Sequence, residues 1–285
     1  MRFKTPAALL LLFAMAAPAD AARLRVEAAP YLQDVVDSAA YGDTVFVAPG
    51  LYPQLRLRTG IRLISEGGPE VTTLRNDRFW VIQAKQTDSL TVVDGFTLDG
   101  VEAAEGILHT EDSFLTVRNC VLQNGWSGIR SEYSDLRVEN CVISGCQNGI
   151  YLFESRGTII GNTISGCING MSVTSSSPRI LRNEVVRNSV GIFVTEHSNP
   201  SIGGSLSSAN RIHHNRGGNI RNSSYLKEFS IRTKKPMTLS VPFNFWGTDC
   251  PDSLSFRGPV IWSPWVAENG KESLESCPPE TGAIH

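Results

Sequence analysis

A repeat of 21 residues restricts the fold of this chain more than any other feature of its sequence. A Gly followed by Ile or Met recurs at this step through the middle of the chain, with apolar residues in phase on either side. The four dipeptides are Gly128-Ile129, Gly149-Ile150, Gly170-Met171 and Gly191-Ile192. A fixed period near 20 residues predicts a solenoid, in which each repeat forms one coil and packs against the next.

Each repeat has the pattern of strands. Ile150 and Leu152 alternate with Tyr151 and Phe153, and Asn-Gly and Ser-Gly pairs separate such short runs. The alternation predicts strands and the pairs predict turns. A helical solenoid of this kind needs about 33 residues or more per repeat, and the consensus of a leucine-rich repeat is missing. We therefore predict an all-β fold, a parallel β-helix over residues 22–266 with coils of about 21 residues.

Polar turn residues recur in phase with the coils. Two columns hold Asn, one with Asn162, Asn183, Asn210 and Asn244, the other with Asn188 and Asn215. Asn is common in turns for local reasons. The fixed phase over several coils favours ladders, in which stacked side chains satisfy turn groups that strand pairing leaves open.

The same two columns hold cysteines in earlier coils. Neighbouring strands lie about 4.8 Å apart, which is inside the Cα range of a disulfide. Stacked free thiols are the alternative, because buried Cys also packs well. A third bond would tether the C-terminal tail, residues 267–285, to the preceding cap. The predicted pairs are Cys120–Cys141, Cys146–Cys167 and Cys250–Cys277.

The N-terminal segment predicts export. Arg2 and Lys4 precede an apolar run over residues 7–17, followed by small residues suited to cleavage, so residues 1–21 are predicted to be a signal peptide. A buried N-terminal helix is the alternative. The run is too short for a membrane span, and no later stretch approaches that length. We expect a secreted or periplasmic chain, in which disulfides are possible.

Both ends of the solenoid are predicted to carry caps. Apolar residues at helical spacing after Pro30, among them Leu32, Val35 and Val36, predict a short amphipathic helix within an N-terminal cap of about residues 30–52. Three of the five Trp fall in the last segment, about residues 241–266. We interpret them as an aromatic plug on the last coil, with a sugar-stacking site as the alternative.

Several motifs resemble a known family. They are Gly42-Asp43-Thr44-Val45, Ala48-Pro49-Gly50-Leu51-Tyr52, the segment 64–71, the Asn-Cys and Asn-Gly-Ile repeats, and the ending from Asn244-Phe245-Trp246-Gly247 to Ser263-Pro264-Trp265. Together they resemble bacterial secreted right-handed parallel β-helix proteins of the pectin-lyase-like superfamily over nearly all of residues 23–266. The resemblance implies a right-handed single-stranded β-helix. It leaves function open, because this fold hosts lyases, hydrolases, epimerases and adhesins.

The motifs of the enzymes with this fold are missing. Asp88, Asp94 and Asp99 lie near one early coil, but no neighbouring coil repeats an Asp at these positions, so no Ca²⁺ site is indicated. Asn162-Thr163 is followed by Ile164 where a polygalacturonase has Asp, and the Asp-Pro-His-Glu of alginate epimerases is absent. No metal or other cofactor is predicted.

One outward strand face is a candidate binding surface. Aromatic rings beside charged groups suit a sugar chain, and the candidate ligand-binding residues are Arg130, Glu132, Tyr151, Phe153 and Phe193. The next position along the strands holds Glu154 and Glu196, followed by His197. These three are the catalytic candidates, because two carboxylates about 9.5 Å apart are compatible with an inverting glycosidase.

Two further segments contain residues that could form a site. His213 and His214 are adjacent, and adjacent side chains on a strand point different ways, so we expect a solvated pair that does not share a metal ion. Residues 211–235 are locally basic, which suits an acidic polysaccharide or a phosphate-rich surface. A charged loop that keeps the last coils soluble is the alternative.

Three functions are compatible with these features. The predicted one is an exported, monomeric, non-catalytic β-helix that binds polysaccharide or a cell-surface glycan. A lyase, glycoside hydrolase or epimerase with a non-standard site is the second, and a structural or assembly module is the third. With 26 Lys and Arg against 28 Asp and Glu, the formal charge of −2 argues against nucleic acid as a partner.

Overall fold

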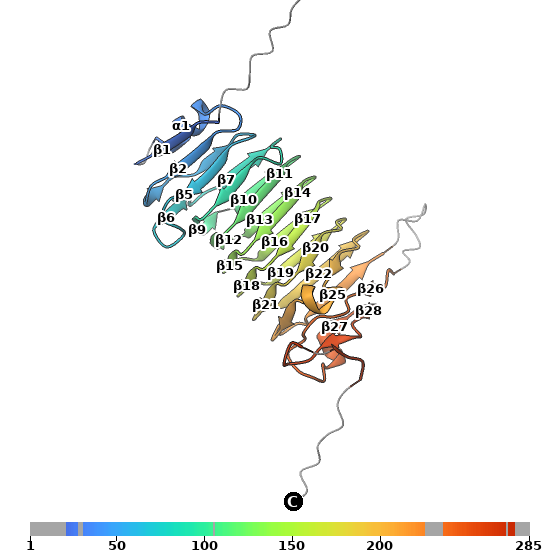
Figure 1. Ribbon diagram of the computed structural model, residues 1–285. Coiled ribbons are helices and arrows are strands. Elements are labelled where there is room, and N and C mark those ends of the chain that lie inside the picture. Colours follow the sequence, from blue (N-terminus) through green and yellow to red (C-terminus); the bar gives the residue numbers. More distant parts are fainter. Residues whose placement is uncertain (1–20, 28–30, 105, 226–235, 272, 277–285) are drawn as a thin grey trace, which may run out of the picture.

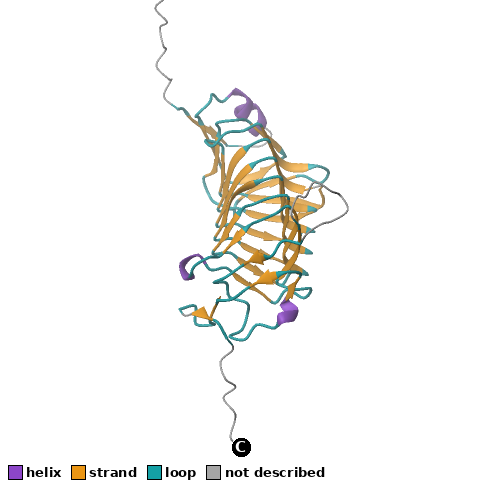
Figure 2. Ribbon diagram, turned by 90° about the vertical axis from the view of Figure 1, so that its right-hand side faces the viewer, coloured by secondary structure: helices purple, strands orange, loops and turns teal. Residues whose placement is uncertain are grey.

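The computed structural model describes residues 21–27, 31–104, 106–225, 236–271 and 273–276, and shows a right-handed parallel β-helix. Figure 1 shows the coils stacked in sequence order from the N-terminal to the C-terminal cap, and Figure 2 shows the strands of successive coils side by side. Most of the predicted signal peptide, part of the basic segment 211–235, and Cys277 with the end of the tail lie outside the described residues.

Each regular coil contributes one strand to each of three parallel sheets. Sheet A contains β1 (Arg23–Val26), β2 (Thr44–Val47), β5 (Arg62–Ser65), β8 (Val92–Asp94), β11 (Phe114–Arg118), β14 (Asp135–Glu139), β17 (Arg156–Ile160), β20 (Arg179–Leu181) and β23 (Ser201–Ile202). Sheet B contains β3 (Gly50–Tyr52), β6 (Thr72–Arg75), β9 (Thr97–Ala104), β12 (Val121–Gly125), β15 (Val142–Ser144), β18 (Thr163–Ser165), β21 (Glu184–Val186) and β24 (Arg211–His213). Sheet C contains β4 (Leu55–Leu57), β7 (Trp80–Lys85), β10 (Gly106–Glu111), β13 (Ser127–Glu132), β16 (Asn148–Phe153), β19 (Asn169–Thr174), β22 (Val190–Glu196), β25 (Ile220–Ser224) and β27 (Phe256–Arg257).

The inward residues of the three sheets form one core. Val138 of sheet A, Ile143 of sheet B and Ile150 of sheet C are completely buried, and their counterparts in neighbouring coils are buried with them. Burying one such side chain contributes about 1.5–3 kcal/mol relative to leaving it exposed. The recurring Gly is explained by close approach: a Cβ on Gly149 would lie 2.5 Å from the carbonyl oxygen of Gly170 in the next coil.

The predicted Asn ladders are present. Asn183 Oδ1 accepts from the backbone N–H of Asn162 at 3.0 Å and from its Nδ2 at 2.9 Å, and Asn210 Oδ1 accepts in the same way from Asn183. Asn244 continues this ladder, and Asn188 with Asn215 forms the second. The ladders satisfy buried turn groups that the sheets leave unpaired.

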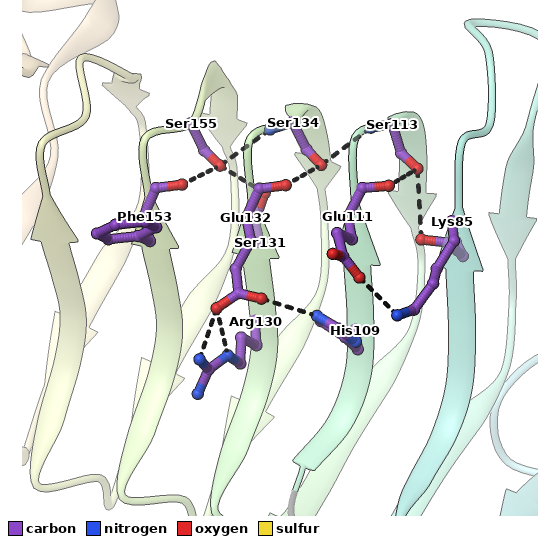
Figure 3. Close-up of polar contacts among 11 residues, drawn as sticks. Lys85, His109, Glu111, Ser113, Arg130, Ser131, Glu132, Ser134, Phe153 and Ser155 are labelled. Atoms are coloured by element: carbon purple, nitrogen blue, oxygen red, sulfur yellow. Dashed lines mark hydrogen bonds and ion pairs between the residues drawn. The ribbon is translucent and has the colours of Figure 1, made fainter.

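A third ladder, of serines, was not predicted. The backbone N–H of Ser134 donates to the hydroxyl of Ser155 at 3.2 Å (Figure 3). The backbone N–H of Ser155 donates to the hydroxyl of Ser176 at 2.9 Å. The ladder runs from Thr87 through Ser113 to Ser198 at the corner between sheets C and A. Ser113, Ser134, Ser155 and Ser176 recur at the 21-residue step, so the sequence did carry this signal.

The predicted bonds Cys120–Cys141 and Cys146–Cys167 are not formed. All four thiols are free and buried. Side chains at matching positions of parallel strands leave the backbone in the same direction. Their Cβ atoms therefore stay about as far apart as the strands, at about 4.8 Å, whereas a disulfide needs about 3.8 Å. Each thiol instead donates to the carbonyl two residues earlier, as Cys120 does to Arg118 at 3.1 Å. Cys250 is disulfide-bonded, and its predicted partner Cys277 lies outside the described residues.

We expect the four core thiols to be unreactive in the native protein and alkylated after denaturation without reductant. The hydrogen bond within each pair, together with burial, raises the pKa of the Cys141 and Cys146 thiols well above the usual range, and the same hydrogen bonds lower the pKa of Cys120 and Cys167. Burial, which all four thiols share, keeps an alkylating reagent away from them in the native protein. Peptide mass spectrometry checks this, with Cys250 unmodified as internal reference. Either core pair recovered as a linked peptide would contradict the free thiols.

Both predicted caps are present. The helix α1 (Leu32–Ser38) buries Leu32 and Val36 over the first coil. At the other end Phe256 stacks on Trp262 and meets Trp246 edge to face, which makes the predicted aromatic plug. The remaining elements are η1 (Leu206–Ser208), η2 (Ser253–Ser255) and the pairs β26 (Leu239–Ser240) with β28 (Val260–Ile261) and β29 (Trp265–Val266) with β30 (Ser273–Leu274). Among the described residues, no helix is long and apolar enough to cross a membrane.

Candidate functional site

The outward face of sheet C carries a line of side chains that runs the full length of the sheet. We call it the basic column because four of its nine members are Arg and none is Asp or Glu. Strand register places these residues at matching positions of successive coils, about 4.8 Å apart. The basic column consists of Arg56, Gln83, His109, Arg130, Tyr151, Ser172, Phe193, Arg221 and Arg257.

Two guanidinium groups of this column lie over aromatic rings of the neighbouring coils. The Arg130 guanidinium lies over the ring of Tyr151, 5.3 Å from its centroid, and that of Arg221 lies over Phe193 at 5.0 Å. Both rings are half-buried. Each cation–π contact is worth about 0.5–1 kcal/mol at an exposed site and holds the two groups in a fixed relative position.

Glu132 connects the basic column to a second column, which lies two residues further along the same strands and includes Lys85, Glu111, Glu132 and Phe153. Its Oε1 accepts from Nε and Nη2 of Arg130 at 3.0 and 2.5 Å, and its Oε2 lies 3.2 Å from Nε2 of His109 (Figure 3). Burial opposes ionisation of Glu132, but the hydrogen bonds from Arg130 and His109 outweigh burial and lower the pKa of its carboxyl group. Beside it, Lys85 pairs with Glu111 at 2.5 Å.

His109 is held by packing as well as by Glu132. Its ring stacks on that of Trp80, with centroids 4.7 Å apart, and only 8% of the residue is exposed. Trp80 occupies the space that Gly106 leaves open, because a Cβ there would lie 1.9 Å from the indole ring. The Nδ1 atom of His109 is buried and has no hydrogen-bond partner among the described residues.

A pocket of about 880 Å³ adjoins the N-terminal end of the basic column. Arg56 and Gln83 belong to both. Helix α1 closes the far side of the pocket with Gln33 and Asp37, and the remaining lining residues are Pro53, Gln54, Leu55, Arg58, Phe79 and Trp80. The ring of Phe79 is largely exposed. The pocket therefore combines two guanidinium groups with two aromatic rings.

The catalytic candidates lie at the corner between sheets C and A. Glu154 is exposed and lines a groove of about 500 Å³ together with Tyr133 and Ser175. Glu196 and His197 are not among the residues lining the groove. Glu196 accepts from the Ser175 hydroxyl at 2.5 Å, and Nδ1 of His197 is 3.1 Å from the backbone oxygen of Tyr225. Of the three candidates, Glu154 is therefore the one that lines the corner groove, and Glu196 reaches it through Ser175.

Comparison with known proteins identifies the family. A family model described as "Periplasmic copper-binding protein (NosD)" matches residues 36–232. The chain belongs to the NosD family. The periplasmic description of the NosD family agrees with the predicted export, and no curated protein matches the chain.

Three solved structures are similar to this NosD family member. An alginate lyase from Paenibacillus sp. str. FPU-7 is 14% identical, with a TM-score of 0.51 over 84% of this chain and 99% of that one. The mannuronan C-5 epimerase AlgE4 A-module of Azotobacter vinelandii is 14% identical, with a TM-score of 0.48 over 82% and 89%. The catalytic domain of a GH87 alpha-1,3-glucanase is 7% identical, with a TM-score of 0.38 over 88% and 69%. At 14% identity, the likeness to the alginate lyase shows the fold alone.

The structure brings the predicted binding residues together. Arg130, Tyr151 and Phe193 share the basic column, while Glu132 and Phe153 share the second column. Sequence reasoning missed the rest of the basic column and the pocket beside it. His109 had a signal, since it lies one 21-residue step before Arg130, but Arg56, Arg221 and Arg257 lie in coils of irregular length.

Two of the three aspartates near the early coil, Asp94 and Asp99, accept hydrogen bonds from other side chains. Asp94 accepts from Nε of Arg118 and Nδ2 of Asn119, both at 2.8 Å. Asp99 accepts from Arg75 and Asn124 at 2.9 and 3.0 Å. Guanidinium and amide donors therefore occupy oxygens that a calcium site in the NosD family member would need.

Proposed function

We propose that this exported NosD family member binds an acidic polysaccharide, without catalysis, along the basic column. The observation that carries the proposal is the composition of that column, which crosses nine adjacent strands and contains four Arg, two half-buried rings and no carboxylate. A guanidinium group binds a carboxylate in a planar, bidentate manner, and an aromatic ring packs on the apolar face of a sugar.

The charges along the column favour an acidic ligand. Arg56, Arg221 and Arg257 form no ion pair with any described residue, so their donors remain available to a ligand. Arg130 is held in position by Glu132 and Tyr151. Arg56, Arg130, Arg221 and Arg257 follow one another along the coil axis at three, four and one coils, so an extended acidic polymer several sugars long meets more than one of them. Exposed charges screened by salt also predict that binding weakens as ionic strength rises.

A lyase or epimerase acting on such a polymer is the second candidate. It is favoured by His109, whose ring is oriented by the Glu132 carboxylate, and by Arg130 and Tyr151 on the neighbouring coils. A histidine oriented by a carboxylate is a common general base. Burial of His109 under Trp80 argues against direct contact with substrate, and for this reason we favour binding.

We expect the double variant Tyr151→Ala with Phe193→Ala to weaken binding of alginate or pectate by about 10- to 100-fold. Two lost stacking contacts of about 0.5–1.5 kcal/mol each, together with their buried area, account for this range. Affinity electrophoresis in gels with and without the polysaccharide measures it, with dextran as the neutral control. Phe114→Ala is the matched control, because Phe114 is an exposed ring on β11 that lines the corner groove and lies outside the column.

These measurements distinguish polysaccharide binding along the basic column from an enzyme acting on the same polymer. Unchanged retardation of the double variant, or equal retardation of the wild type by dextran, would refute binding along the column. Loss of binding in Phe114→Ala alone would move the site to the corner groove. Release of shortened or unsaturated products from the same polysaccharides by the wild type, abolished in His109→Gln, would establish the enzyme instead.

The description of the NosD family also names copper. Divalent copper takes a tetragonal set of nitrogen and oxygen ligands. The described part of the chain contains no group of three or more His, Cys, Asp or Glu side chains placed to hold a metal ion. The donor set therefore does not fit divalent copper there, and a role in copper binding would require a site with fewer ligands.

A further inference from the structure

The basic column ends at a wall on its N-terminal side. Its last strand there, β4, is the edge of sheet C, and helix α1 lies at the same end of the stack of coils (Figure 1). Gln33 of the helix holds this edge, since its Nε2 donates to the Arg56 carbonyl at 3.2 Å and its Oε1 accepts from the Arg56 N–H at 2.8 Å. We call α1 with Gln33 and Asp37 the end wall, because both residues line the pocket that adjoins the column.

The end wall is part of the packed first coil. Leu32 and Val36 of the helix are buried in the core. On the other side of the helix, Nη1 of Arg58 donates to the backbone oxygen of Asp37 and to that of Ala39 at 3.2 Å. A cation at the C-terminal end of a helix also interacts favourably with the helix dipole. A polymer that follows the column past Arg56 therefore meets a fixed obstacle.

The pocket between the end wall and the column has the lining of a sugar site. Its volume of about 880 Å³ lies within the range of ligand pockets, about 300–1,000 Å³. The exposed ring of Phe79 and the half-buried ring of Trp80 offer apolar surfaces for a sugar. The guanidinium group of Arg56, which forms no ion pair with a described residue, offers donors for a carboxylate. This lining fits a uronate, which is a sugar that carries a carboxylate.

Asp37 distinguishes the end of a polymer from its interior. Its Oδ1 accepts from Nε2 of Gln33 at 3.0 Å, and its Oδ2 has no hydrogen-bond partner among the described residues. An ionised carboxylate only accepts hydrogen bonds, so a ligand group that meets Oδ2 must carry a proton. A sugar inside a chain is joined to the next sugar by a glycosidic oxygen, which has no proton. A terminal sugar has a hydroxyl group at that position.

We propose that the pocket holds the terminal uronate of an acidic polysaccharide whose following sugars lie along the basic column. The inference rests on the proposed function, because it places one end of the same polymer. The terminal carboxylate meets Arg56, the sugar ring packs on Phe79, and the terminal hydroxyl donates to Asp37. Arg130 lies three coils further along, at about 14 Å, and meets a later sugar of the same chain. Both ends of a polysaccharide carry such a hydroxyl, and the experiment below distinguishes them.

Calorimetric titration with hexasaccharides of defined ends tests the proposal. Hexagalacturonate or hexamannuronate is used, according to whether pectate or alginate retards the wild type. The intact form is compared with its methyl glycoside, which blocks the reducing end, and with a form whose unsaturated non-reducing end lacks the hydroxyl at C4. We expect one of the two modified forms to bind about 10-fold more weakly than the intact one, as for a lost hydrogen bond to a charged group. That form identifies the bound end.

Variants of the pocket connect this difference to its residues. Asp37→Ala should remove the difference, so that all three hexasaccharides bind equally. Asp34→Ala is the matched control and should keep it, because Asp34 is an exposed aspartate on the same helix that does not line the pocket. Phe79→Ala should weaken binding of the intact hexasaccharide by about 2- to 10-fold through loss of one stacking contact, and Phe114→Ala should leave it unchanged.

The results distinguish failure of the end pocket from failure of the column. Equal affinity of the wild type for the three hexasaccharides, or a difference that persists in Asp37→Ala, would overturn the end pocket and leave binding along the column in place. Absence of retardation by both alginate and pectate would overturn the proposed function, and the end pocket with it.

Discussion

Replacing Asn183 with Ala is expected to lower the free energy of unfolding by about 4 kcal/mol, because the variant leaves several buried groups without partners. Asn183 Oδ1 accepts from the backbone N–H and the side-chain amide of Asn162, and its Nδ2 donates to the Ile159 carbonyl at 2.9 Å. Each buried group left unsatisfied costs about 1–3 kcal/mol. Thermal unfolding followed by circular dichroism should show a midpoint lower by roughly 10 °C.

The control for this variant is Asn169→Ala. Nδ2 of Asn169 also donates to an Asn of the neighbouring coil, but the residue is only half-buried, so water can replace the lost partner. Its midpoint should fall by no more than about 2–4 °C. Equal shifts in the two variants would show that burial of the ladder is not what makes it stabilising.

Gly149→Ala is expected to be nearly as destabilising, by about 3 kcal/mol, for a steric reason. The new Cβ would lie 2.5 Å from the Gly170 carbonyl oxygen and 2.6 Å from a methyl group of Ile164, so two coils must move apart. Overpacking of a tight interior costs about 1–3 kcal/mol and sometimes more. The same measurement of thermal unfolding applies, and the purified variant should still show the circular dichroism of a β protein.

Two comparisons show whether close approach is the cause. Gly128→Ala should match Gly149→Ala, because its Cβ would lie 2.5 Å from the next carbonyl oxygen as well. Val142→Ala on the same coil as Gly149 changes an exposed side chain and should stay within about 0.5 kcal/mol of the wild type. A wild-type midpoint for both glycine variants would mean that the coils are not packed this closely in solution.

The regular part of the fold could be predicted because one number, the period, fixes the position of every residue in it. Asn162 and Asn183 are in the same column in the sequence and in the structure, and the same reasoning extends to the serines around Ser134 that the prediction omitted. The period could not settle the chemistry within a column. It placed Cys120 beside Cys141 correctly, but bond formation depends on the separation of their Cβ atoms.

The site was only partly predictable for a related reason. Tyr151 and Phe193 lie in coils of constant length, so counting along the sequence placed them in one line. Loops of unequal length separate Arg221 and Arg257 from those coils, and only strand register reveals that they continue the line. The rings of His213 and His214 meet edge to face because His214 has a φ of 55°. Alternation along a strand does not predict this backbone angle, and it led to the wrong expectation that the two side chains diverge.

The serine ladder bears on how such a chain can change in length. Each coil receives one hydrogen bond from the coil before it and gives one to the coil after it, as Ser155 does between Ser134 and Ser176. Duplication or deletion of one complete 21-residue unit therefore leaves every partner matched, and it lengthens or shortens the outward line of side chains by one position. If the chain binds a polysaccharide as proposed, the length of polymer that the surface can hold is set by the number of these units.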